Sequence, residues 1–179
     1  MDISKIPVGR DPPGDINAVI EIPQGGPVKY EFDPASGALF VDRFLPTAMH
    51  YPGNYGFVPH TLAEDGDPID VLVLTPDPIL PGAVMRCRPV GVLLMEDEHG
   101  RDDKIIALPI DTPHRFDEAL VSHTDLPAGL RDQIAHFFTH YKDLDRGKWV
   151  KVHGWADAAE AARLVDGAVA RAGQKAAAG

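Results

Sequence analysis

Short runs of apolar or alternating residues, separated by clusters of Pro, Gly and Asp, occupy residues 18 to about 109. Such runs predict strands, and the clusters predict the turns between them. In Val28-Lys29-Tyr30-Glu31-Phe32 a period of two places the apolar side chains on one face and the charged ones on the other. The run 84–95 is expected to bend at Pro89 or Gly91. The predicted strands span residues 18–22, 28–33, 39–43, 69–74, 84–95 and 104–108.

The period changes after Leu126-Pro127, where Asp125 and Pro127 are start signals for a helix. The apolar residues there recur at helical spacing: Leu130, Ile134, Phe137, Phe138 and Tyr141. A further strand is predicted over 149–155 and an amphipathic, Ala-rich helix over 157–171, with 173–179 as a frayed tail.

These elements predict a mainly β protein with flanking helices, of the α+β class, in which a small β-barrel lies beside two main α-helices. A chain of 179 residues fits one domain, and neither a repeat nor a long linker divides it. Hydrophobic residues make up 44% and charged residues 25%, which is typical of a globular protein. We therefore expect residues 1–179 to form a single domain.

The formal net charge of -10 opposes binding to nucleic acid or to anionic membranes, because both need an excess of Lys and Arg. Cys87 is the only cysteine, so an intrachain disulfide is excluded, and the polar start of the chain favours a cytoplasmic protein. If the substrate is an anion, a local basic cluster or bound cations must reverse the local charge.

Three carboxylates lie within six residues in Asp65-Gly66-Asp67-Pro68-Ile69-Asp70. Carboxylate oxygens in such a cluster suit hard cations such as Mg²⁺. Asp, Gly and Pro are also common in ordinary turns, so the segment taken alone is compatible with a turn that binds no metal. It is not an EF-hand loop, since Asp70 and Pro76 stand where that loop needs Gly and Glu.

A second acidic group follows around Gly100, made of Asp97, Glu98, Asp102 and Asp103, and would be a solvated hairpin tip if it stood alone. Two acidic groups at strand ends favour a cluster of divalent ions, which needs carboxylates from separate strands. No P-loop and no Ser or Cys nucleophile motif is present, so a metal-bound water is the natural nucleophile. Groups suited to bind phosphate recur nearby: Lys29, Arg43, Tyr51, Tyr55, Lys104, Tyr141 and Lys142.

A series of motifs runs along nearly the whole chain: Ile20-Glu21-Ile22-Pro23, Lys29-Tyr30-Glu31, Gly37-Ala38-Leu39-Phe40-Val41-Asp42-Arg43, Tyr51-Pro52-Gly53-Asn54-Tyr55-Gly56, Asp65-Gly66-Asp67-Pro68-Ile69-Asp70-Val71, His140-Tyr141-Lys142-Asp143-Leu144 and Gly147-Lys148-Trp149-Val150. With these motifs the chain resembles the soluble family I inorganic pyrophosphatases of the short bacterial type. The resemblance implies a five-stranded, OB-like barrel, a homohexamer, and Mg²⁺-dependent hydrolysis of pyrophosphate to two orthophosphates by a metal-activated water. Several Mg²⁺ ions per site are implied, and other divalent ions such as Mn²⁺ are alternatives.

The resemblance also assigns roles to residues. Asp67 resembles the general base or the group that orients the nucleophilic water, and Asp70 a bridging ligand between two metals. The residues that resemble metal ligands are Asp65, Asp70 and Asp102 for the tight pair, Asp97 with Asp102 for a substrate-borne Mg²⁺, and Glu21 and Glu31 for metal-bound water or a further ion. Those that resemble phosphate ligands are Lys29, Arg43, Tyr55, Lys104, Tyr141 and Lys142, supported by Tyr51 and Lys148.

Two rival functions remain open from the sequence. One is another metal-dependent phosphoanhydride hydrolase, such as one acting on nucleoside triphosphates, and the other is an OB-type binding module, which the negative charge opposes. His136 and His140, four residues apart on the predicted helix, have a spacing that can bind zinc. The resemblance instead suggests a pH-sensitive subunit contact, and a plain solvated face is the third interpretation.

Overall fold

The structure is a computed structural model that describes residues 2–110 and 120–178. Its strands are β1 (Ile16–Ile22), β2 (Val28–Asp33), β3 (Ala38–Phe44), β4 (Asn54–Phe57), β5 (Asp70–Val73), β6 (Val84–Asp97), β7 (Gly100–Arg101), β8 (Lys104–Pro109) and β9 (Val150–Ala156). Its helices are the short 3-10 helices η1 (Ile3–Lys5) and η2 (His123–Asp125) and the α-helices α1 (Ala128–His140) and α2 (Ala158–Ala178).

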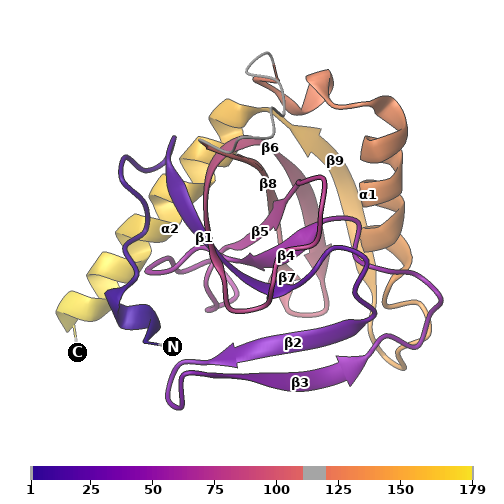
Figure 1. The fold of residues 1–179 in the computed structure, drawn as a ribbon, viewed down its shortest axis with the longest axis horizontal. Coiled ribbons are helices and arrows are strands. Elements are labelled where there is room, and N and C mark those ends of the chain that lie inside the picture. Colours follow the sequence, from indigo (N-terminus) through magenta and orange to yellow (C-terminus); the bar gives the residue numbers. More distant parts are fainter. Residues whose placement is uncertain (1, 111–119, 179) are drawn as a thin grey trace.

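Five strands close into a barrel in the order β1-β4-β5-β8-β6, because β6 also pairs with β1 (Figure 1). The pair β5 and β8 is parallel, whereas the other barrel pairs are antiparallel. Strand β6 is long enough to pair with β9 and β7 as well, and its register shifts between Pro89 and Gly91, where a bend was predicted. The predicted class, a five-stranded barrel with two main α-helices, is confirmed.

Two of the predicted strands do not enter the barrel. Strands β2 and β3 pair with each other in a separate hairpin, which lies below the barrel in Figure 1. Their place in the barrel is taken by β4, which the sequence pattern did not predict. A Cβ at Gly56 in β4 would lie 1.9 Å from the Val19 carbonyl oxygen of β1, so only glycine permits this close pairing.

Alternation along the strands divides the apolar side chains between two clusters. Leu72 of β5 lies in the cluster that contains Phe137 of α1, whereas its neighbours Val71 and Val73 lie in the cluster that contains Val165 of α2. Burying each such side chain stabilises the fold by about 1.5–3 kcal/mol. The two helices thus cover opposite faces of the same strands.

Helix α2 extends beyond its predicted end at residue 171, into the segment 173–179 that was predicted as a frayed tail. Helix α2 continues through Ala178, because the segment after Arg171 is rich in Ala, the best helix former, and ends near Lys175, whose charge suits a helix C-terminus. Residue 179 lies outside the described residues. No helix in residues 2–110 or 120–178 is long and apolar enough to cross a membrane.

Candidate active site

The first residues of two neighbouring parallel strands form the centre of the site. Asp70 begins β5 and Lys104 begins β8, and the two are partners in the strand register. The Lys104 Nζ atom donates a hydrogen bond to Asp70 Oδ2 at 2.6 Å and another to Asp102 Oδ1. Burial would lower the pKa of Lys104, but the two carboxylates outweigh it and hold this pKa far above its ordinary value. A buried ammonium therefore lies between two of the predicted metal ligands.

The turn that carries Asp65 and Asp67 has the tight geometry expected of its sequence. Gly66 adopts a φ of +103°, which favours glycine, and the Asp67 amide donates to Asp65 Oδ1 at 3.1 Å. The Ala63 amide donates to the Asp67 carbonyl at 2.7 Å and closes the turn. Burial and the nearby Asp70 carboxylate raise the pKa of Asp65. The turn thus places the Asp65 carboxylate near Asp70, the first residue of β5.

Glu21, near the end of β1, adds a buried carboxylate to this centre. Its Oε1 atom accepts a hydrogen bond from the Phe32 amide at 2.7 Å. Burial, together with the charges of Asp70 and Glu31, raises the pKa of Glu21 to about 7. For the same kind of reason, burial and the repulsion from Asp70 raise the pKa of Asp102 to about 6, against the attraction of Lys104.

A second pair of opposite charges joins the end of β6 to the turn after α1. Lys142 Nζ donates to Asp97 Oδ2 at 2.6 Å, and both side chains are more than nine-tenths buried. Burial would raise the pKa of Asp97, but Lys142 outweighs it and lowers this pKa. Lys142 also lies 3.9 Å from Glu98, whose carboxylate accepts the Trp149 amide at 3.3 Å.

The β2–β3 hairpin carries the next group of charges. Lys29 Nζ lies 2.5 Å from Glu31 Oε1 and 3.4 Å from Asp42 Oδ2. Arg43 Nη1 donates to Asp42 at 3.1 Å, and Arg43 Nε lies 3.6 Å from Asp145 Oδ2. The hairpin therefore brings the predicted ligands Lys29, Glu31 and Arg43 together.

Asp42 and Asp145 are site residues that the sequence analysis missed. A signal existed for Asp42, which precedes Arg43 in a strand motif, and for Asp145, which follows Lys142 in the turn after α1. The contact between Asp145 and Arg43 joins segments about a hundred residues apart, and the spacing of residues along the chain does not reveal such a contact.

Three buried tyrosines pack beside these charged residues. Tyr51, Tyr55 and Tyr141 are buried, and the rings of Tyr51 and Tyr55 lie 5.3 Å apart. Lys104 Nζ lies 5.7 Å from the centre of the Tyr55 ring. Burial raises the pKa of all three hydroxyls, so they stay protonated and able to donate. Lys148, in contrast, is exposed, and its amide donates to the Asp145 carbonyl.

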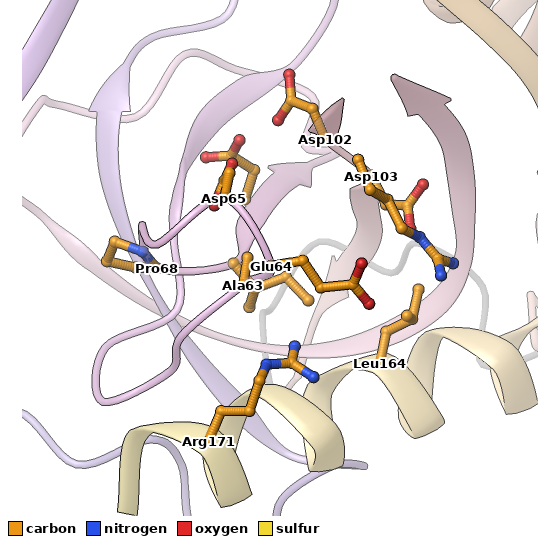
Figure 2. Close-up of a pocket in the computed structure, with 11 residues that line it drawn as sticks. Ala63, Glu64, Asp65, Pro68, Asp102, Asp103, Leu164 and Arg171 are labelled. Carbon is orange, nitrogen blue, oxygen red and sulfur yellow. The ribbon is translucent and has the colours of Figure 1, made fainter. Parts of the chain in front are cut away.

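A small pocket of about 30 Å³ separates the acidic turn from α2 (Figure 2). Asp65, Asp70 and Asp102 are among the residues that line it, and Arg171 reaches towards it from α2. Asp103 also lines the pocket, but its carboxylate accepts the Met95 amide and Arg101 Nε, so its role is to hold the β6–β7 hairpin.

The donor set fits hard divalent cations. Within the described part of the chain, no group of three or more Asp, Glu, His or Cys side chains is arranged so that it could hold a metal ion. The carboxylates of Asp65, Asp70 and Asp102 nevertheless line one pocket, where burial, together with the Asp70 carboxylate, raises the pKa of Asp65 and that of Asp102. Oxygen donors of this kind suit Mg²⁺.

The two histidines of α1, His136 and His140, have exposed side chains. The rings of His136 and His140 are 4.6 Å apart, and His140 Nδ1 lies 2.8 Å from Asp143 Oδ2. Their role at a subunit contact stays a prediction.

Comparison with known proteins decides the family. The model of the family described as inorganic pyrophosphatase matches residues 18–173. The chain belongs to this family. An inorganic pyrophosphatase of Caulobacter vibrioides is 60% identical over 172 residues, covering 96% of this chain and 97% of the relative. An inorganic pyrophosphatase of Brucella melitensis is 56% identical over 175 residues, covering 96% of this chain and 98% of the relative.

Solved pyrophosphatase structures share the fold. The inorganic pyrophosphatase of Thermus thermophilus superposes with a TM-score of 0.92 at 47% identity, covering 97% of this chain and 99% of that one. A structure from Anaplasma phagocytophilum, described as an inorganic phosphatase, has a TM-score of 0.92 at 51% identity, covering 94% of this chain and 99% of that one. The resemblance to inorganic pyrophosphatases stated from the motifs is thereby confirmed.

Proposed function

We propose that this pyrophosphatase hydrolyses inorganic pyrophosphate to two orthophosphates with the help of Mg²⁺. The observation that carries the proposal is the position of Lys104, 2.6 Å from Asp70 and also bonded to Asp102. Carboxylates that suit Mg²⁺ and an ammonium that suits phosphate thus share one wall of the site. Hydrolysis of a polyanion needs both kinds of group within the length of the substrate.

The acidic residues would hold the metal ions. We assign Asp65, Asp70 and Asp102 to the tight metal pair, Asp97 with Asp102 to a substrate-borne ion, and Glu21 and Glu31 to metal-bound water or a further ion. When bound, Mg²⁺ supplies positive charge that neutralises the substrate and lowers the pKa of a coordinated water. Burial, together with neighbouring carboxylates, raises the pKa of Glu21 and that of Asp102, and a bound cation would favour their charged forms, which supports this assignment.

Asp67 has a different role in the proposal. Its backbone is held in the turn by the Ala63 amide, while its side chain is exposed to solvent. A carboxylate on a fixed backbone can orient the attacking water and accept its proton. Asp67 therefore serves as the general base or the orienting group, and its neighbours in the turn serve as ligands.

The basic and phenolic residues would bind the phosphates: Lys29, Arg43, Tyr55, Lys104, Tyr141 and Lys142. In the structure the lysines and the arginine are paired with carboxylates, so their side chains are already ordered before the substrate arrives. Their positive charges also stabilise the leaving phosphate. Tyr51 and Lys148 support this group without a direct role.

Assembly and location belong to the same proposal. The family resemblance supports a homohexamer, and the single cysteine of the chain, which excludes an intrachain disulfide, supports a cytoplasmic enzyme. Sedimentation of the purified chain measures the first property directly, and a monomer at micromolar concentration would overturn it.

Phosphate release tests the reaction. The assay compares pyrophosphate and ATP as substrates, each with Mg²⁺ and with EDTA. We expect rapid release from pyrophosphate with Mg²⁺, little from ATP and none with EDTA. No Mg²⁺-dependent release from pyrophosphate would overturn the proposal, and comparable release from ATP would favour a broader phosphoanhydride hydrolase.

A further inference from the structure

The acidic turn belongs to a loop between β4 and β5 that is closed at its base. The Val58 amide donates to the Ile69 carbonyl at 3.0 Å. The Thr61 hydroxyl donates to the Val58 carbonyl at 2.5 Å and accepts the Ile69 amide at 3.0 Å. These bonds fix where the loop leaves and re-enters the barrel, while residues 63–68 extend away from it.

Leu62 joins this loop to α2 through both of its backbone polar groups. Its amide donates to the Ala168 carbonyl at 3.0 Å, and its carbonyl accepts a hydrogen bond from Arg171 Nε at 2.8 Å. Figure 2 shows the Arg171 side chain reaching from α2 towards the turn that carries Ala63 and Asp65. A guanidinium donor makes a stronger hydrogen bond to a carbonyl than a neutral donor does. Helix α2 therefore fixes the loop one residue before the turn begins.

Gly167 makes room for the Arg171 side chain. A Cβ at Gly167 would lie 3.3 Å from Arg171 Nη1, which is tighter than an ordinary contact. Glycine inside a helix costs about 1 kcal/mol relative to alanine. Helix α2 carries this unfavourable residue one turn before Arg171, where it leaves space for the guanidinium to lie back along the helix.

We propose that Arg171 is a positioning residue of the active site, which acts through Leu62 to hold the Asp65–Asp70 carboxylates in the geometry that binds Mg²⁺. This inference rests on the proposed metal role of those carboxylates. The path is short, because the Ala63 amide that follows Leu62 donates to the Asp67 carbonyl and closes the turn. Movement of Leu62 is thus passed to Asp65 and Asp67 through the adjoining backbone.

Hydrogen exchange of the metal-free enzyme in EDTA tests this role without any catalysis. The variants are Arg171→Ala, Arg171→Lys and the control Arg163→Ala, whose guanidinium pairs with Glu160 on the exposed side of α2. We expect the amides of residues 62–67 to exchange about tenfold faster in Arg171→Ala, because the loop opens locally, and to be unchanged in Arg163→Ala. Amides of β6 should keep their rates in all three variants.

Mg²⁺ binding gives the second measurement. Calorimetric titration without substrate should show about tenfold weaker Mg²⁺ binding in Arg171→Ala, because ordering the loop now costs binding free energy. Arg171→Lys, which keeps a cationic donor, should recover part of the loss, and Arg163→Ala should bind like the wild type. Turnover at saturating Mg²⁺ should stay within about twofold of the wild type in the control Arg163→Ala.

Unchanged loop exchange and Mg²⁺ binding in Arg171→Ala would overturn the inference, and so would faster exchange spread equally over β6. A wild type that releases no phosphate from pyrophosphate would instead overturn the proposed function, while the exchange measurement would still report on the Arg171–Leu62 contact.

Discussion

Lys104 Nζ lies 2.6 Å from Asp70 Oδ2, and the two residues begin adjacent parallel strands of the barrel. The Lys104 side chain is 2% exposed, so its charge is removed from water and balanced by Asp70 and Asp102. The register between β5 and β8 thus places a phosphate-binding group and two metal-binding groups at one point. The buried ion pairs of Lys104 with these carboxylates also stabilise the folded protein.

Replacing Lys104 with Met should destabilise the metal-free fold. The change leaves the Asp70 and Asp102 carboxylates without their buried partner, which we expect to lower the free energy of unfolding by about 3 kcal/mol. Urea unfolding at pH 8 in EDTA measures the effect. Lys151→Met, at a 64% exposed side chain paired with Glu96, should change the same quantity by less than about 0.5 kcal/mol. Equal stability of Lys104→Met and the wild type would contradict this account of the pair.

His123 should make stability depend on pH. Its ring stacks on Trp155 at 5.5 Å, and its buried Nδ1 atom has no hydrogen-bond partner within the described residues. Burial, helped by the nearby Arg131, lowers the pKa of His123, although Asp125 and Asp157 oppose this. Because the folded state favours the neutral ring, His123 adds to the free energy of unfolding. This addition is complete above the pKa of about 6.5 that His123 has in the unfolded chain, and it is lost as the pH falls through the lower pKa of the folded state.

The variant His123→Phe keeps a stacked ring without a titrating group. Its free energy of unfolding should fall less than that of the wild type between pH 7.5 and pH 5, as measured by urea unfolding at both values. An NMR titration of His123 in the wild type should find its pKa below the ordinary value. A raised pKa, or equal pH dependence in both proteins, would show that the interpretation is wrong.

Much of the fold was predictable from local patterns, and the exceptions have physical causes. Strands such as β2 and β8 follow the apolar runs that predicted them. Strand β4 was missed because Asn54-Tyr55-Gly56-Phe57 follows Pro52-Gly53 and reads as part of a turn, and its strand form depends on pairing with β1 and β5. The placement of β2 and β3 outside the barrel likewise depends on tertiary packing, which the period of two in their sequences does not reveal.

The residues of the candidate site that lie in sequence motifs were predictable. Those that belong to it only through long-range contacts were not. The Asp65–Asp70 turn, Lys104 and Lys142 were all named from the sequence, and the structure brings them together with their acidic partners. Asp145 and Arg171 were not, because their partners Arg43 and Leu62 lie about a hundred residues away in the chain. Such contacts exist only once the barrel and the helices have assembled.

Asp145 should position Arg43 for the substrate. The two side chains lie 3.6 Å apart, and within the described residues neither Arg43 Nε nor Asp145 Oδ2 has a hydrogen-bond partner. We expect Asp145→Asn to raise the KM for pyrophosphate about fivefold while kcat changes less than about twofold, because a loosened Arg43 weakens binding more than chemistry. Steady-state kinetics measures both constants. Asp145→Glu should restore part of the loss, and Asp166→Asn, at an exposed position of α2, should match the wild type.

The division of roles within the acidic turn separates Asp67 from Asp70. Asp70 is bonded to Lys104 at the strand end, whereas Asp67 is exposed in the turn. If Asp70 binds metal and Asp67 serves the water, Asp67→Asn should lower turnover by about a hundredfold with Mg²⁺ affinity retained. Loss of Mg²⁺ affinity in Asp67→Asn would reassign it as a ligand.

The most direct test of the account is the Mg²⁺ dependence of phosphate release from pyrophosphate by Asp70→Asn beside the wild type. Removing one carboxylate charge from the metal group should raise the Mg²⁺ concentration at half-maximal rate by about tenfold or more. The account predicts this shift together with no release in EDTA. An Asp70→Asn enzyme with the wild-type Mg²⁺ requirement would contradict it.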